Sequence, residues 1–108
     1  MLASSALQKI RLYEPAAARH DVEPVYPIEA DQRTVMRLIT DIKADRHGAA
    51  QVEEIGAVVE RMTTAGADCV LLACTELSVI SSELRTSLPM FDAAEILARV
   101  IVRTAQED

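Results

Sequence analysis

Three consecutive residues, Cys74, Thr75 and Glu76, follow an apolar run that reads DCVLLA. A thiol can act as a nucleophile or as a general acid and base, and a neighbouring hydroxyl can bind a carboxylate. In open parallel sheets, ligands bind outside the carboxyl ends of the strands. If the apolar run forms such a strand, these three side chains stand where a ligand would lie. The pattern therefore predicts a thiol-based site at Cys74.

The residues after Thr75 are expected to begin a helix, whose first turn carries partial positive charge and free N–H groups. Both features would lower the pKa of the Cys74 thiol and hold an anion. The alternative is that Cys74 is a small buried hydrophobe, a common state for a free cysteine. Cys69 lies inside the apolar run and is interpreted as a core residue. The two thiols would be about 16 Å apart along an extended strand, too far for a disulfide.

Two long helices are predicted immediately before this strand. Residues 31–44 place apolar side chains at helical spacing, and a second stripe runs through residues 52–62. Residues 45–48 are predicted to form the turn between them, and Gly66 the left-handed end of the second helix. Earlier in the chain, residues 5–13 favour a helix that kinks or restarts at Pro15. Residues 22–28 contain Pro24 and Pro27, which predicts a short or edge strand.

After the strand at residues 68–73, a short helix is predicted over residues 78–84 and a short strand over residues 88–91. Asp92 is a candidate N-cap with Glu95 in capping-box position. The helix that follows carries an apolar face, which is expected to point inward and consists of Ile96, Leu97, Val100 and Ile101. Helices that alternate with short apolar strands predict an α/β fold with a short, mostly parallel sheet flanked by helices.

Composition excludes several classes of function. The 108 residues fit one domain or lobe, and 50% hydrophobic content is enough for a core. A net charge of −6 without a Lys/Arg cluster, and few aromatic residues, argue against nucleic-acid binding. No run reaches the roughly 18 apolar residues of a membrane span, and the N-terminal residues do not read as a secretory signal. A cytoplasmic location is therefore expected, with both thiols reduced.

The stretch GADCVLLACTELSVI resembles the second cysteine motif of the aspartate/glutamate/hydantoin racemase superfamily, and of aspartate racemases in particular. The similarity extends upstream through VYPIEADQRTVMRLITDIKAD and downstream through PMFDAAEILARVIVRTA. The first residues, LASSALQKIRLYEPAA, also resemble the family's segment that follows a strand. The resemblance thus spans essentially the whole chain.

Members of this superfamily have two similar α/β lobes, each of which supplies one cysteine to a cleft between them, and they use neither pyridoxal phosphate nor a metal. The resemblance implies that Cys74 is the second thiol, that Thr75 lies next to the substrate carboxylate, and that Lys43 can pair with a carboxylate. Glu76 belongs to the motif as a substrate contact or, alternatively, as a helix cap or loop anchor. The alternative for Lys43 is a solvated helix end. The substrate implied is aspartate or glutamate.

The chain is about half as long as members of the superfamily. Residues 1–108 are therefore expected to form a single lobe, equivalent to the second, with residues 87–108 resembling the closing strand and helix that pack on the first lobe. The first lobe and its catalytic cysteine would be absent, and the segment KADRHG departs from a family pattern that often has Gly soon after the lysine. His20 and His47 lie outside the motifs and are interpreted as surface or turn residues.

Three hypotheses follow. In the first, two copies form a homodimer and oppose two Cys74 thiols, which gives an amino-acid racemase. In the second, a single thiol protonates an enolate from one face, as in the related decarboxylases that keep only the second cysteine. In the third, the chain is an inactive racemase fragment that binds a partner or has no activity. Whether the short chain is natural or a piece of a longer product is left open at this point.

Overall fold

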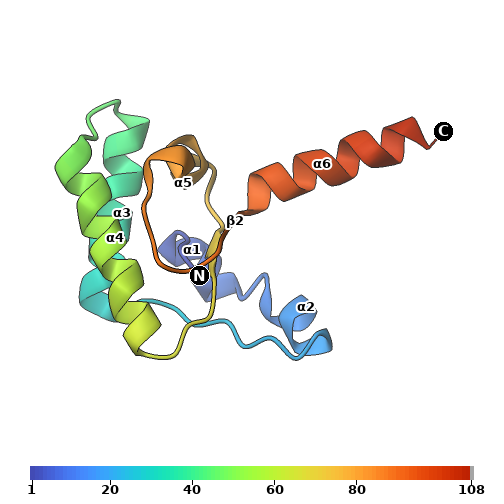
Figure 1. Cartoon of the computed structure of the whole chain (residues 1–108), viewed down its shortest axis with the longest axis horizontal. Helices are drawn as coiled ribbons and strands as arrows, with labels where there is room; N and C mark the ends of the chain where they lie inside the picture. Colours follow the sequence, from blue (N-terminus) through green and yellow to red (C-terminus); the bar gives the residue numbers. More distant parts are fainter. Residues whose placement is uncertain (108) are drawn as a thin grey trace.

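The computed structural model describes residues 1–107 (Figure 1). The short parallel sheet consists of β1 (Val70–Leu72) and β2 (Met90–Asp92), paired with Leu72 opposite Asp92. Leu2 forms a further parallel bridge to Leu72 from the other side of β1. β1 is therefore the central strand, and the predicted α/β class with a parallel sheet is confirmed.

The long helices α3 (Glu29–Lys43) and α4 (Ala49–Thr64) form where they were predicted and supply most of the core. Their apolar stripes are buried against β1 and the N-terminal Leu2, which is fully buried. Gly66 has a φ of 106°, so it occupies the left-handed conformation that was predicted for the end of the second helix. The buried side chains of the two helices are Val35, Leu38, Ile39, Ile55, Val58, Val59 and Met62.

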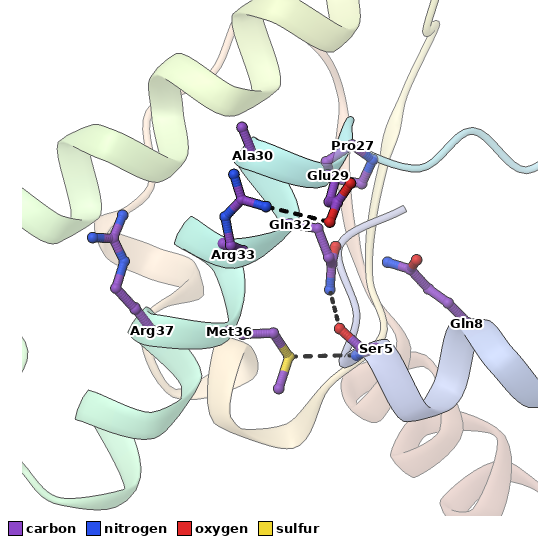
Figure 2. Close-up of a pocket in the computed structure, with 9 residues that line it drawn as sticks. All are labelled: Ser5, Gln8, Pro27, Glu29, Ala30, Gln32, Arg33, Met36 and Arg37. Carbon is purple, nitrogen blue, oxygen red and sulfur yellow. Dashed lines mark hydrogen bonds and ion pairs between the residues drawn. The ribbon is translucent and has the colours of Figure 1, made fainter.

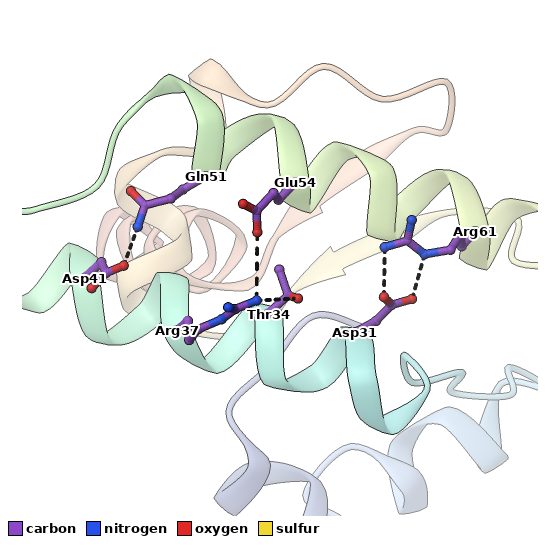
Figure 3. A network of polar contacts seen from close by, with 7 residues as sticks. All are labelled: Asp31, Thr34, Arg37, Asp41, Gln51, Glu54 and Arg61. Carbon is purple, nitrogen blue, oxygen red and sulfur yellow. Dashed lines mark hydrogen bonds and ion pairs between the residues drawn. The ribbon is translucent and has the colours of Figure 1, made fainter.

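Polar contacts join α3 to α4 on their outer sides (Figure 3). The Arg61 guanidinium donates to both oxygens of the mostly buried Asp31 carboxylate, at 2.8 and 2.9 Å. This contact lowers the pKa of Asp31. Farther along the pair, Gln51 donates to Asp41. These contacts fix the register of the two helices, and so fix where the end of α3 stands relative to the sheet.

The remaining elements are short. Helix α1 (Ser5–Ile10) ends at Arg11 in a left-handed conformation, and the chain restarts as α2 (Glu14–Arg19) with Pro15 in its first turn. This is one of the two outcomes that were predicted at Pro15. After β1, α5 (Thr75–Val79) and the 3₁₀ helix η1 (Ser81–Glu83) replace the single helix predicted over residues 78–84.

Two predictions were wrong. Residues 22–28 form no strand but run as an extended segment, because Pro24 and Pro27 have no N–H to donate to a neighbouring strand. Cys69 is exposed and not part of the core. It precedes β1, in which Val70 and Leu72 point into the core, so alternation along the chain turns Cys69 outward.

The last helix, α6 (Ala93–Gln106), forms as predicted, with the Asp92 side chain accepting a hydrogen bond from the Ala94 N–H at 3.1 Å. The prediction that its apolar face points inward was wrong for this chain, because no residue of α6 is buried. Figure 1 shows α6 leaving the body of the molecule after β2 and extending away from it. The exposed apolar residues of this helix are Ile96, Leu97, Val100, Ile101 and Val102.

Candidate active site

Three helices begin at the carboxyl edge of the sheet. Helix α1 follows Leu2, α5 follows β1, and α6 follows β2. Cys74 is the N-cap residue of α5, with extended backbone angles (φ −145°, ψ 132°) that carry the chain from the strand into the helix. The predicted position of Cys74, at the end of the central strand and at the start of a helix, is therefore what the structure shows.

The four residues singled out from the sequence meet around one carboxylate, that of Glu76. The Cys74 thiol donates to Glu76 Oε2 at 3.1 Å, and the Thr75 hydroxyl donates to the same oxygen at 3.2 Å. Lys43 Nζ, at the end of α3, lies 3.8 Å from Glu76 Oε1. We refer to Lys43, Cys74, Thr75 and Glu76 as the Glu76 cluster.

The pKa of the Cys74 thiol is raised, which contradicts the expected lowering by the helix start. Burial is the largest cause, and the hydrogen bond to the Glu76 carboxylate is the next. Backbone N–H groups of Glu76 and Leu77 lower the pKa, as expected of a helix start, but they are outweighed. The pKa of Glu76 is lowered, first by the hydrogen bond from Cys74. The thiol of this cluster is therefore harder to deprotonate than that of an unperturbed cysteine.

Two polar residues beside Cys74 were not predicted as site residues. The Ser78 hydroxyl donates to Asp92 Oδ1 at 2.6 Å and lies 3.3 Å from the Cys74 carbonyl oxygen. The same Asp92 oxygen caps α6. A signal was present in the sequence, because Ser78 is four residues after Cys74 on a helix and Asp92 follows the neighbouring strand. This contact connects the backbone at Cys74 to the start of α6.

The two histidines lie outside the cluster. His47 Nε2 is 3.9 Å from a Glu83 carboxylate oxygen, and His20 ends α2. Within residues 1–107, no group of three histidine, cysteine or acidic side chains is arranged to hold a metal ion. None of the helices described here is both long enough and apolar enough to cross a membrane.

Comparison with known proteins finds similarity over most of the chain. The family described as Asp/Glu/Hydantoin racemase matches residues 1–101. A protein of Pectobacterium carotovorum subsp. carotovorum, named only as an uncharacterized protein in the pnlA 3′ region, is 34% identical over 105 residues. That alignment covers 94% of this chain and 69% of the relative, whose name states no activity.

Proposed function

This chain belongs to the Asp/Glu/hydantoin racemase family, and from that membership we propose that it transfers protons at the Cα atom of an amino acid of the aspartate type, with Cys74 as the acting thiol and without a cofactor. The observation that carries the proposal is the position of the Cys74 thiol. It lies at the carboxyl end of the central strand and donates to Glu76 at 3.1 Å. Family membership supports a racemase-type activity, and a substrate of the aspartate type is part of the proposal.

The chemistry needs a base on one face of Cα and an acid on the other. The base breaks the Cα–H bond and keeps the proton, and the electron pair moves into the enolate of the substrate carboxylate. The Cys74 S–H bond then breaks as a new Cα–H bond forms on the opposite face, which leaves a thiolate. In the reverse direction the Cys74 thiolate is the base. No electrons are exchanged with another molecule, so the step is balanced without an oxidant.

Lys43 and Thr75 are proposed to bind the substrate carboxylate. Lys43 is 63% exposed and its 3.8 Å contact with Glu76 is loose, so a substrate carboxylate can compete for the ammonium group. The exposed Thr75 hydroxyl lies beside it and can donate a second hydrogen bond. A cation and a hydroxyl that hold the carboxylate would also stabilise the enolate that forms from it. Aspartate and glutamate are both compatible with these contacts.

The second acid–base group is proposed to come from another copy of this chain. The other cysteine of the chain, Cys69, is exposed and precedes β1, whereas Cys74 follows its opposite end. It therefore cannot reach the substrate side of Cys74. We propose that residues 1–108 act as one lobe, equivalent to the second lobe of the family, and that two such lobes form a homodimer with two Cys74 thiols facing each other. The reaction requires reduced thiols, which favours a cytoplasmic location.

A second candidate function is stereospecific protonation by Cys74 alone. It is favoured by the raised pKa of this thiol, which suits a proton donor better than a base. The two candidates differ in their products. A racemase converts either enantiomer of the substrate into a mixture, whereas a one-sided proton donor gives a single enantiomer.

The experiment is to incubate L-aspartate and L-glutamate with the protein and to measure the D-enantiomers by chiral chromatography. Wild type is compared with Cys74→Ala and with the matched control Cys69→Ala. The proposal expects D-aspartate from the wild type and from Cys69→Ala, and none from Cys74→Ala. Equal formation of D-aspartate by wild type and Cys74→Ala, or none by either, would count against it.

A further inference from the structure

A pocket lies between α1 and α3 (Figure 2), with a volume of about 820 Å³. Its lining includes Ser5 and Gln8 from the start of the chain and Gln32, Arg33 and Met36 from α3. Binding sites for small ligands commonly have volumes of roughly 300 to 1,000 Å³. None of the residues of the Glu76 cluster lines this α1–α3 pocket, so it is a separate place on the molecule.

Gln32 presents a buried acceptor that has no partner. Its side-chain Nε2 donates to the Ala3 carbonyl oxygen at 2.9 Å and lies 3.3 Å from the Ser5 hydroxyl. Because a carbonyl oxygen can only accept, the orientation of the Gln32 amide is fixed. Its Oε1 is buried and finds no hydrogen-bond partner within residues 1–107, on a residue that is only 9% exposed. Such an atom is stabilised by a ligand that brings an N–H or O–H group.

Gln8 presents the complementary group. Its Nε2 is also buried and without a hydrogen-bond partner in the described part of the chain. Figure 2 shows the Gln8 side chain extending from α1 toward the side of the pocket where the Gln32 amide lies. The two side chains thus offer one unused acceptor and one unused donor to the same region. A carboxamide has the matching donor and acceptor on one carbon atom.

The same pocket carries a pair of opposite charges. Arg33 is 3.4 Å from Glu29, one turn earlier on α3, and both side chains are largely exposed. Exposed pairs of this kind are weak, so each partner can exchange the other for a ligand group. Arg33 can bind a carboxylate and Glu29 an ammonium group. The Met36 side chain, whose Sδ accepts from the Ser5 N–H at 3.3 Å, offers a polarisable surface for methylene groups between the two ends.

We propose that the α1–α3 pocket binds a free α-amino acid that bears a side-chain carboxamide. The carboxamide N–H donates to Gln32 Oε1, its oxygen accepts from Gln8 Nε2, and the zwitterionic end pairs with Arg33 and Glu29. The proposal does not rest on the proposed function at Cys74, since the two sites share no residue. Binding to this pocket involves no covalent step.

The test is a titration of the ¹⁵N-labelled full chain with L-glutamine, followed by NMR. Saturable shifts are expected at the Gln8 and Gln32 side-chain amides and at Ser5. Gln8→Leu and Arg33→Ala are each expected to weaken binding roughly tenfold, the effect of about 1.4 kcal/mol from one lost hydrogen bond or ion pair to the ligand. Lys9→Leu is the matched control, because Lys9 is exposed on the same helix and does not line the pocket.

L-glutamate separates a carboxamide site from a general anion site. Its side-chain carboxylate would face the Gln32 oxygen without a proton to share, so it is expected to bind at least roughly tenfold more weakly than L-glutamine. The Cys74→Ala variant should bind L-glutamine as the wild type does, whatever its activity at Cα. The proposal is overturned if no saturable shift occurs, if L-glutamate binds equally well, or if Gln8→Leu and Arg33→Ala bind like Lys9→Leu.

Discussion

At the scale of single residues, the state of Cys74 is set by its burial and by one neighbour. The half-buried thiol donates to the Glu76 carboxylate, and both features raise its pKa. Glu76→Gln removes the negative charge and supplies an amide that can donate to a thiolate. The pKa of Cys74 should therefore fall, and alkylation by iodoacetamide at pH 8 should become roughly threefold to tenfold faster.

This measurement belongs in a Cys69→Ala background, because Cys69 is exposed and would react as well. The alkylation rate should be measured over a range of pH. A changed pKa of Cys74 moves the curve of rate against pH along the pH axis, whereas a changed accessibility of the thiol alters the rate at every pH. A Thr75→Val variant serves as a matched control, since Thr75 contacts the same Glu76 oxygen without being a cause of the raised Cys74 pKa. An unchanged pH profile in Glu76→Gln would mean that Glu76 does not hold the thiol protonated.

Asp31 gives a second prediction at this scale. Its pKa is lowered by the hydrogen bonds from Arg61. A carboxyl group with a lowered folded-state pKa stabilises the fold above its unfolded pKa, and this stabilisation is lost as the pH falls through the folded value. The free energy of unfolding of the wild type should therefore decrease as the pH falls below about 4, near the ordinary pKa of Asp.

The check on Asp31 is urea unfolding at several pH values, with wild type beside Asp31→Asn. The variant should be less stable at pH 7 and should show a smaller loss of stability between pH 5 and pH 2. Glu29→Gln, on the same turn of α3 but exposed, is the control. Parallel pH profiles for wild type and Asp31→Asn would contradict the assignment.

At the scale of elements, Asp92 connects the sheet, α5 and α6. It ends β2, accepts from the Ser78 hydroxyl at 2.6 Å and caps α6 through the Ala94 N–H. Asp92→Ala should lower the free energy of unfolding by about 1 kcal/mol, the usual effect of a lost N-cap, and should reduce the helicity of the first turn of α6. Asp92→Asn, which keeps a capping oxygen, should lose less. Denaturant titration and amide exchange in α6 would show both effects.

Element prediction from the sequence succeeded where the local pattern and the tertiary fold agree. The stripes at Val35 and Ile55, and the glycine at position 66, determine α3, α4 and the turn before β1 by short-range rules. It failed where the outcome depends on a distant neighbour. Whether residues 22–28 pair as a strand depends on a neighbouring strand as well as on their two prolines, and the direction in which Cys69 points depends on where β1 begins.

The candidate site was predicted only in part, because some of its contacts also depend on residues that are distant in the sequence. The position of Cys74 follows from the end of an apolar run, whereas Lys43 and Thr75 were singled out only by the family resemblance, and the structure brings both of them to Glu76. The raised pKa of Cys74 was missed, because helix-start effects were weighed without the burial and the Glu76 contact that only the fold supplies. The contact between Ser78 and Asp92 joins residues 14 apart and likewise depends on sheet register.

At the scale of the whole molecule, the surface is larger than a chain of this mass requires. A compact monomer of this size exposes about 5,900 Å², whereas this chain exposes 7100 Å². The excess, about 1,200 Å², is comparable to the roughly 800 Å² that each partner buries in a standard interface. Much of the exposed apolar area lies on α6, which extends from the body (Figure 1).

The proposed homodimer predicts that Leu97→Asp, in the middle of this apolar face, will produce monomers. Sedimentation velocity should show a dimer for the wild type and a monomer for Leu97→Asp at the same concentration. Arg99→Ala, which is two residues after Leu97 and so on nearly the opposite side of α6, is exposed and should remain dimeric. A wild-type chain that sediments as a monomer at all concentrations tested would rule out the dimer and, with it, the proposed pair of Cys74 thiols.

The proposed function requires the Cys74 thiol to exchange a proton with Cα of an acidic amino acid. The most direct measurement is loss of the Cα–H signal of L-aspartate in D₂O, followed by ¹H NMR with wild type, Cys69→Ala and Cys74→Ala. Exchange is expected with wild type and with Cys69→Ala, and it should be abolished in Cys74→Ala. Exchange at the same rate in wild type and Cys74→Ala, or no exchange by the wild type, would contradict the proposed function.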